Sequence, residues 1–392
     1  MSKEVNKLDY FGRGIIKDNN KVIFVDKALP KDIIDYEIIK DKKKYSEAKI
    51  SKIIKESPNR IIPKCPYYDN CGGCDFWHAK ETLEKEFKIN KAKELLGRCD
   101  EYYDTNIFYR NKVTLHIKNN KIGYYKEKTN DIISINSCLI VNPLINKIID
   151  KINHIDFSKY NVSKVIIKCN LDKVLLYLDN DVDKEFIDYL SSVDTIIVKD
   201  KVIKGKGYLE EIIDNKVFKI TKEAFFQVNK EGLTHILNII KEYLKDKNIN
   251  KMLDLYCGES LWGILLSDLC NSITGIEINK ESCDNALMNL KNNNINNIKI
   301  INGKVEDYLN EFKNIDLIIV DPPRSGLDKK TITYLKEIQS NYLIYISCDM
   351  LSLKRDLELL KENYNISKVY LVNMFKKTYH CEVVTILERK NK

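Results

Sequence analysis

The sequence of 392 residues contains no run of about 18 apolar residues, which excludes a transmembrane helix. No internal repeat is visible in it. The first residues, MSKEVNKLDY, carry charges with no apolar segment behind them, so we expect no signal peptide and a cytosolic protein that binds no membrane. The net charge is only +8, from 65 basic and 57 acidic side chains, which is too small an excess for a nucleic-acid-binding tail.

The basic excess is concentrated near the start of the chain. Residues 1–56 hold 14 basic and 10 acidic side chains, which is half of the net charge. The β-rich segments 22–26, 33–39 and 45–54, separated by turns, predict a small barrel. Basic residues on such a barrel suit nucleic acid, although a solvated loop explains the KDKKK run at 40–44 equally well.

Eleven cysteines are many for a cytosolic chain, where disulfides are disfavoured and clustered thiols indicate metal binding or catalysis. Three of them follow the spacing Cys65-x5-Cys71-x2-Cys74 in a loop too rich in Gly and Pro for a regular helix or strand. A metal centre needs a fourth ligand, for which Cys138 is preferred over His78. Four thiolates suit structural zinc and an iron–sulfur cluster alike, so the spacing leaves both open.

The remainder of the chain divides into two parts by pattern. Residues 57–215 begin with this cysteine loop and a helix predicted at 81–97, and then mix strand-like and helical stretches. The strongest predicted strands there are 113–117, 165–169 and 195–199. Residues 216–392 alternate between β and α, with a helix predicted at 231–245. Apolar runs predict strands in this part at 252–256, 273–277, 315–320, 342–347, 368–372 and 383–387.

Continuously apolar strands between helices predict a parallel-rich, doubly wound α/β sheet, whose ligands bind at the carboxyl ends of the strands. The segment MLDLYCG (252–258) ends such a strand in a glycine turn. About 20 residues on, Glu277 ends the next strand, where a carboxylate can accept both ribose hydroxyls of a nucleoside cofactor. Asp321 ends a further strand and precedes two prolines, so its carboxylate can orient a planar heterocycle, while Arg324 can meet phosphate. An ordinary α/β turn is the alternative for the first of these motifs.

Two more strand ends carry reactive side chains. Cys348, in YISCD (345–349), follows an apolar strand directly and is a candidate nucleophile. The alternative is a buried structural thiol. Glu382, in TYHCEVV (378–384), begins the last strand and is a candidate general base.

These segments together resemble the RNA 5-methyluridine methyltransferase family, in particular its bacterial 23S ribosomal-RNA members. The resemblance spans nearly the whole chain, in the family's own order. It is carried by CPYYDNCGGCDFWH (65–78), YRNK (109–112), FFQVN (225–229), DLYCG (254–258), DPPRSGLD (321–328) and SCD (347–349).

The resemblance implies a Rossmann-like class I methyltransferase domain (216–392), an N-terminal TRAM domain of OB-like barrel type that binds RNA (1–56), and a central α+β domain with an iron–sulfur loop (57–215). It implies Cys348 as nucleophile and Glu382 as base. It also implies two groups of ligand-binding residues. A [4Fe–4S] cluster would be held by Cys65, Cys71, Cys74 and Cys138. S-adenosylmethionine would be bound by Gln227, Tyr256, Gly258, Glu277 and Asp321.

The chemistry explains why these residue types are needed. Carbon 5 of uracil is a poor nucleophile, and thiolate addition at carbon 6 makes an enolate that attacks the methyl group of the cofactor. A base then removes the carbon 5 proton and the thiol leaves. The uridine must be drawn out of its stack, which favours folded RNA loops over duplex.

The chain departs from the family at three places: Ser260 stands where a glycine is usual and Leu261-Trp262 follows it, Gly303-Lys304 replaces an acidic pair, and Lys376 replaces a proline. Three functions follow as hypotheses. The first is 23S ribosomal-RNA methylation, by a protein that we expect to be a monomer. The second is transfer-RNA methylation by the same chemistry. The third is an iron–sulfur RNA-binding protein with a degenerate cofactor pocket.

Overall fold

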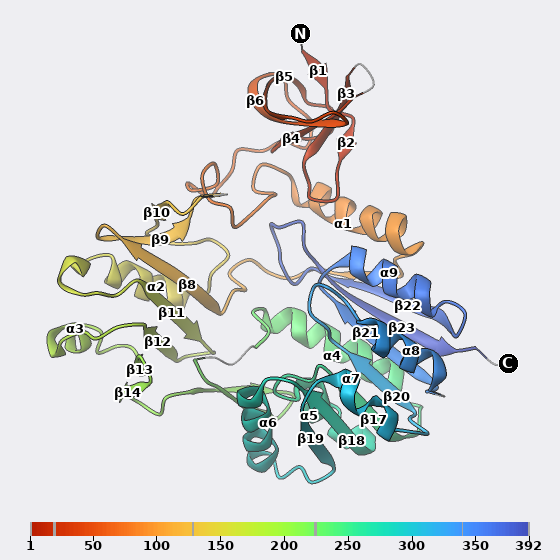
Figure 1. Ribbon diagram of the computed structural model, residues 1–392. Helices are drawn as coiled ribbons and strands as arrows, with labels where there is room; N and C mark the ends of the chain where they lie inside the picture. Colours follow the sequence, from red (N-terminus) through yellow and green to blue (C-terminus); the bar gives the residue numbers. More distant parts are fainter. Residues whose placement is uncertain (1, 19–20, 128, 223–225, 339, 391–392) are drawn as a thin grey trace.

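The computed structural model describes residues 2–18, 21–127, 129–222, 226–338 and 340–390. Their strands form a six-stranded, a seven-stranded and an eight-stranded sheet and one two-stranded hairpin. The three sheets lie in three parts of the molecule, and most of the helices flank the eight-stranded sheet (Figure 1). No helix among these residues is long and apolar enough to cross a membrane.

The six-stranded sheet contains β1 (Lys3–Glu4), β2 (Lys7–Leu8), β3 (Gly14–Asp18), β4 (Lys21–Asp26), β5 (Ile33–Asp41) and β6 (Tyr45–Lys55). Its order is β1-β5-β6-β4-β3-β2, and all neighbours are antiparallel except β4 and β6. The strands predicted at 22–26, 33–39 and 45–54 are confirmed as β4, β5 and β6. The KDKKK run at 40–44 is exposed at the end of the β5–β6 hairpin.

The seven-stranded sheet contains β8 (Lys112–Lys118), β9 (Lys121–Tyr125), β10 (Ile132–Ser134), β11 (Lys164–Cys169), β12 (Val174–Leu178), β13 (Thr195–Val198) and β14 (Lys201–Lys204). Its order is β10-β9-β8-β11-β12-β13-β14. Apolar residues of α2 (Pro143–Ile152) and α3 (Lys184–Tyr189) fill its core together with Tyr68 and Trp77. The cysteine loop therefore packs on this sheet. The predicted strands 113–117, 165–169 and 195–199 are confirmed as β8, β11 and β13.

The eight-stranded sheet follows the hairpin of β15 (Leu209–Ile213) and β16 (Lys216–Ile220). Its strands are β7 (Glu101–Tyr103), β17 (Ile249–Leu255), β18 (Cys270–Glu277), β19 (Ile298–Asn302), β20 (Leu317–Val320), β21 (Tyr342–Ser347), β22 (Tyr364–Val372) and β23 (Glu382–Arg389). The order is β19-β18-β17-β20-β21-β23-β22-β7. The first five are parallel and β23 is antiparallel to both neighbours. All six predicted apolar strands are confirmed, whereas β7 and β19 were not predicted.

Helices cover both faces of this sheet, as the doubly wound prediction requires. One face carries α4 (Lys230–Leu244), α5 (Leu261–Leu265) and α6 (Lys280–Asn292). The other carries α1 (Glu81–Leu96), α7 (Val305–Tyr308), α8 (Lys329–Glu337) and α9 (Met350–Leu360). Along β20, Leu317 and Ile319 point to the first face, and Ile318 and Val320 to the second. Burial on both faces is the reason why these strands are continuously apolar. Short 3-10 helices lie at Phe157–Lys159, Ser267–Leu269 and Leu309–Glu311.

The segment that contains α1 and β7 precedes the seven-stranded sheet in sequence but packs on the eight-stranded one. α1 ends at Gly97, whose φ of 78° provides the left-handed cap expected for the helix predicted at 81–97. Ala92 and Leu96 enter the same core as α9. β7 adds a parallel strand beside β22. The chain therefore leaves the last sheet and returns to it, and the predicted boundaries at 56 and 215 stay predictions.

Candidate active site

Three predicted site residues come together at one edge of the eight-stranded sheet. Asp321 directly follows β20, and Cys348 follows β21. Because β23 is antiparallel to β21, with Ser347 opposite Val383, the first residue of β23, Glu382, lies beside the end of β21. The charges of Glu382 and Asp321 consequently both act on the thiol of Cys348.

The thiol of Cys348 lies among charges that oppose one another. Burial raises the pKa of Cys348 to about 12, and the negative charge of Glu382 adds to the rise. Arg324 opposes it with its positive charge and with a hydrogen bond to the thiol. The resting thiol is therefore protonated at neutral pH. It becomes a thiolate only when positive charge near the sulfur, such as that of Arg324, outweighs burial and the charge of Glu382.

The two carboxylates of the site share a region with little water. Burial raises the pKa of Glu382 well above its usual range, and the neighbouring charge of Asp321 raises it further. Burial also raises the pKa of Asp321 to about 6, while the indole N–H of Trp262 opposes this rise by donating to its Oδ2 at 3.1 Å. Two acids so close ionise together only with difficulty, so this edge favours a bound positive charge.

Trp262 is a functional-site residue that the sequence showed only as a departure from a family pattern. It lies in α5, the short helix that follows β17, and its indole reaches the end of β20, the strand next to β17. In the sequence, the one indication of a role for Trp262 is its position in the first turn after the glycine motif. Only the adjacency of β17 and β20 shows which carboxylate it meets.

Arg324 and His380 form the exposed side of the site. The Nη2 atom of Arg324 lies 3.4 Å from Nε2 of His380. Burial lowers the pKa of His380 to about 4, and the charge of Arg324 lowers it further, so His380 is neutral at pH 7. The guanidinium of Arg324 is exposed, in keeping with the predicted contact to phosphate or substrate.

The turn after β17 is tightly wound. Tyr256, Gly258 and Ser260 have left-handed φ values of 62°, 55° and 59°. The N–H of Gly258 donates to Oε2 of Glu277 at 3.0 Å, and the N–H of Asn279 donates to Oε1 at 2.7 Å. The predicted residues Gly258 and Glu277 therefore lie together, beside the point where the strand order reverses between β17 and β20.

Asp254, the acid of the DLYCG motif, is completely buried under this turn. Its Oδ2 accepts the N–H of Gly263 at 3.0 Å, and its Oδ1 has no hydrogen-bond partner among the residues that the structure describes. Burial raises the pKa of Asp254 to about 8, and the charge of Asp321 contributes to the rise. Asp254 is thus mostly protonated at neutral pH.

Ser260 is buried, although the family usually has glycine at its position. Its φ of 59° is a conformation that costs a side-chain-bearing residue about 1–2 kcal/mol. Its hydroxyl lacks a partner within the described part of the chain. A Cβ at Gly263 would stand only 2.4 Å from this hydroxyl, so Ser260 packs directly against the start of α5.

The other two predicted cofactor-binding residues, Gln227 and Tyr256, have hydrogen-bond partners away from Gly258 and Glu277. Gln227 is buried, and its carbonyl accepts from Nδ2 of Asn111, which joins residues 226–229 to the YRNK segment. The hydroxyl of Tyr256 lies 3.3 Å from Oδ2 of Asp328 and points toward α8. Phe225 of the FFQVN segment lies outside the described residues. The roles of Gln227 and Tyr256 in binding a cofactor stay predictions.

The four predicted cysteine ligands line one cavity of about 530 Å³ between the cysteine loop and the seven-stranded sheet. These are Cys65, Cys71, Cys74 and Cys138. His78 instead turns its Nδ1 to the hydroxyl of Tyr68 at 2.5 Å, and it is absent from the cavity lining. No three of the described His, Cys, Asp and Glu side chains stand close enough to hold a single metal ion.

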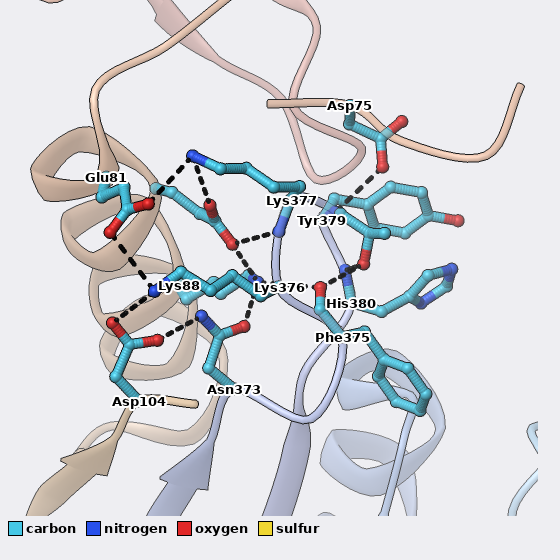
Figure 2. A network of polar contacts seen from close by, with 12 residues as sticks. Asp75, Glu81, Lys88, Asp104, Asn373, Phe375, Lys376, Lys377, Tyr379 and His380 are labelled. Atoms are coloured by element: carbon cyan, nitrogen blue, oxygen red, sulfur yellow. Dashed lines mark hydrogen bonds and ion pairs between the residues drawn. The ribbon is translucent and has the colours of Figure 1, made fainter. Parts of the chain in front are cut away.

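Lys376, which replaces a family proline, is buried and takes part in a polar network with two exposed carboxylates (Figure 2). Its Nζ lies 3.2 Å from Oε2 of Glu81 and 3.2 Å from Oδ2 of Asp104. Lys304, the other replaced position, precedes α7 on the surface. The departure at Lys376 is therefore matched by two local carboxylates, and it leaves Glu382 in place at the start of β23.

A doubly wound sheet with one antiparallel strand inserted beside its parallel strands, and with a nucleoside-type turn, is characteristic of an α/β methyltransferase. The chain superimposes over 99% of its length on the whole Pyrococcus abyssi tRNA (uracil-54, C5)-methyltransferase, solved with S-adenosyl-L-homocysteine, with a TM-score of 0.83 and 23% identity. This likeness confirms the Rossmann-like methyltransferase fold.

The sequence comparisons identify the family. Residues 191–390 match the tRNA (uracil-5-)-methyltransferase family. The chain is 32% identical to an uncharacterized RNA methyltransferase of Clostridium tetani, with 96% of this chain and 93% of the relative covered. It is 29% identical to one of Aquifex aeolicus, with 99% and 98% covered. The chain belongs to the tRNA (uracil-5-)-methyltransferase family and is an S-adenosylmethionine-dependent RNA methyltransferase.

We expect Ser260→Gly to stabilise the protein by about 1 kcal/mol, because glycine adopts the left-handed conformation without strain and removes an unpaired buried hydroxyl. The midpoint of thermal unfolding should rise by about 2 °C. Asn314→Gly is the matched control, since Asn314 is also left-handed, with φ 55°, but exposed and of a residue type that tolerates this conformation. A lower midpoint for Ser260→Gly would contradict strain at this turn.

We expect Asp254→Asn to flatten the pH dependence of stability. The folded pKa of about 8 lies above the ordinary 3.8, so the unfolded chain loses this proton first and the stability of the wild type falls as the pH rises from 4 to 8. One such group changes the free energy of unfolding by at most about 1.4 kcal/mol per pH unit. The stability of the variant relative to the wild type should therefore increase between pH 5 and pH 8 in denaturant titrations. If the stability of the variant and of the wild type changed equally with pH, a raised pKa of Asp254 would be refuted.

Proposed function

We propose that this protein methylates carbon 5 of a uridine in 23S ribosomal RNA. The observation that supports methylation at carbon 5 is the pairing of β21 with β23, because Cys348, a thiol, then lies beside a buried carboxylate, Glu382. Addition to carbon 6 of uracil followed by proton removal at carbon 5 requires one group of each kind within reach of one planar ring. We infer that the protein acts as a monomer in the cytosol.

The residues of the site divide the work. Arg324 stabilises the thiolate of Cys348, which adds to carbon 6 of the uracil. Asp321, held by the indole of Trp262, orients the ring or the cofactor. Glu382 takes the carbon 5 proton after methyl transfer, the electron pair of that bond reforms the ring double bond, and the bond from carbon 6 to sulfur breaks.

S-adenosylmethionine supplies the methyl group, and its sulfonium is the kind of positive charge that this carboxylate-rich edge favours. The turn at Gly258 and the carboxylate of Glu277 would take its nucleoside part, as they lie together where the sheet reverses its strand order. Tyr256 and Gln227 would complete the pocket. Asp254 supports the turn from below through Gly263.

The alternative substrate is transfer RNA. The Pyrococcus abyssi tRNA (uracil-54, C5)-methyltransferase is covered over its full length by this chain. The presence of the six-stranded and seven-stranded sheets in this chain therefore does not by itself favour ribosomal RNA over transfer RNA as the substrate. We propose that the six-stranded sheet is a TRAM-like, OB-type RNA-binding domain, supported by the exposed KDKKK hairpin end at 40–44.

Mapping of 5-methyluridine in total RNA tests the substrate. A deletion strain should lack the modification at one or more 23S sites, and complementation with the wild-type gene should restore it, whereas Cys348→Ala should not. Retention of every 23S site together with loss of a transfer-RNA site would select the alternative.

Purified Glu382→Gln should turn over about 10²–10⁴-fold more slowly and accumulate as an enzyme–RNA adduct, because addition remains possible when proton removal is not. A fully active Cys348→Ala variant would exclude the mechanism.

We also propose that the cysteine cavity holds a [4Fe–4S] cluster. One zinc ion binds four sulfurs at about 2.3 Å each, which demands thiols packed round a point. No such group exists among the described residues, whereas the four thiols line a space of about 530 Å³. In a cluster each thiolate binds a different iron, so a wider separation of the thiols fits. The cluster would tie Cys138 to the cysteine loop.

Protein purified without oxygen should contain about four iron atoms per chain and absorb visible light. Cys138→Ser should lose most of this iron, because it removes one of the four ligands. Cys99→Ser is the matched control, since Cys99 is half-buried like Cys138 but stands outside the cavity lining. One tightly bound zinc per chain and no iron would refute the cluster.

A further inference from the structure

The segment between β22 and β23, residues 373–381, leads directly into Glu382. We call it the base loop. It has neither helical nor strand structure, so most of its backbone groups need hydrogen-bond partners in other parts of the chain. Five other parts of the chain provide them: the cysteine loop, α1, the segment after β7, Tyr109 and the N-cap of α4.

The carbonyls of the base loop are bound almost one by one. Asn373 accepts from Thr105 Oγ1 at 2.7 Å, Met374 from Asn229 Nδ2 at 3.0 Å, and Phe375 from Lys88 Nζ at 3.4 Å. The remaining bonds are Lys376 from Tyr109 Oη at 3.2 Å, Lys377 from the N–H groups of Asp75 and Phe76 at 2.8 and 3.1 Å, and Tyr379 from Lys91 Nζ at 2.7 Å. Inside the loop, the N–H and the hydroxyl of Thr378 donate to the carbonyl of Phe375, and the N–H of His380 donates to Oγ1 of Thr378. Most of the bonds that fix the loop nevertheless come from other parts of the chain.

Asp75 binds the base loop at two points. Its N–H donates to the carbonyl of Lys377, and its Oδ2 accepts the N–H of Tyr379 at 3.0 Å. Asp75 directly follows Cys74, so it joins the cysteine loop to the base loop, with the N–H of Phe76 as a further contact (Figure 2). Lys91 of α1 binds the next peptide unit, through the carbonyl of Tyr379.

Buried charges on α1 complete the attachment. Glu84 and Lys88 are 1% and 0% exposed, and they pair at 2.8 Å. Oε1 of Glu84 also accepts the N–H of Lys377 at 2.9 Å, and Nζ of Lys88 donates to Oδ1 of Asn373 at 2.6 Å. Charges in such a position are costly unless each is well paired, so the network tolerates few alternative loop conformations.

We propose that Asp75 and Lys91 are positioning residues for Glu382. They fix the N–H and the carbonyl of Tyr379, three residues ahead of the base, and His380, the next residue, faces Arg324. These two bonds set the direction in which the chain enters β23, and that direction sets where the carboxylate of Glu382 lies. This inference rests on the proposed role of Glu382 as the base that removes the carbon 5 proton.

The inference separates two steps of the reaction. Cys348 lies at the end of β21, which is held by sheet pairing, so the position of its thiol does not depend on the base loop. Proton removal by Glu382 does need it. A misplaced base loop therefore leaves the addition intact and delays elimination, in which the proton passes to the carboxylate and the sulfur leaves carbon 6.

The experiment uses the full-length protein, RNA from a strain that lacks it, and S-adenosylmethionine with a labelled methyl group. We expect Asp75→Ala and Lys91→Met to release product about tenfold more slowly and to accumulate labelled covalent enzyme–RNA adduct. Adduct formation with RNA containing 5-fluorouridine, which offers no carbon 5 proton, should stay within twofold of the wild type. Asp75→Asn should restore release, because its side-chain oxygen still accepts from Tyr379.

Two features keep the test decisive. Asp69→Ala is the matched control, since Asp69 lies in the same cysteine loop but is 88% exposed. Lys91→Met tests the same residue, Tyr379, from α1, should Asp75→Ala disturb the cysteine loop itself. Amide hydrogen exchange of residues 377–382 should be faster in Asp75→Ala and Lys91→Met than in Asp69→Ala, a readout that needs no RNA.

Unchanged release and unchanged exchange in both variants would overturn the inference. It would also be overturned if adduct formation and release fell by the same factor, because that pattern marks a general loss of structure. If the wild type forms no adduct with any RNA, the proposed function fails, and the exchange measurement still decides whether Asp75 and Lys91 fix the base loop.

Discussion

Strands β17 and β20 are neighbours in the sheet, although the chain builds β18 and β19 between them. This reversal of strand order opens a crevice at the carboxyl ends of the two strands, because the connections on either side run away from it in opposite directions. The turn at Gly258 and the acid Asp321 lie at that point. The antiparallel β23 then brings Glu382 to the same edge. Every proposed catalytic contact depends on this arrangement.

The same arrangement concentrates negative charge where water is scarce. Burial raises the pKa values of Asp254, Asp321 and Glu382, and the charge of Asp321 raises those of Asp254 and Glu382 further. Buried acids without counter-charges reduce stability, so the site is favourable only with a positive partner. Arg324 is one such partner inside the chain. A sulfonium cofactor is another, and this explains why the site is built from acids around a thiol.

Residues that precede the seven-stranded sheet in the sequence also pack on the eight-stranded sheet. α1 and β7 come from residues 81–103, yet they pack on that sheet and contact the base loop. The cysteine loop joins the same place through Asp75. Residues 75–103, which precede the seven-stranded sheet in the sequence, thus provide hydrogen-bond partners for the segment in front of Glu382.

The sequence by itself determined the elements whose signal is local. Continuous apolar runs between helices gave the parallel strands, and the left-handed stop at Gly97 gave the end of α1, because periodicity and turn chemistry act within a few residues. It also determined which strand ends carry Cys348, Asp321 and Glu382. Only the tertiary structure decided that Trp262 meets Asp321, that β7 joins β22, and that Asp75 holds Tyr379. These contacts join residues 59 to 304 positions apart, and no local pattern encodes such a distance.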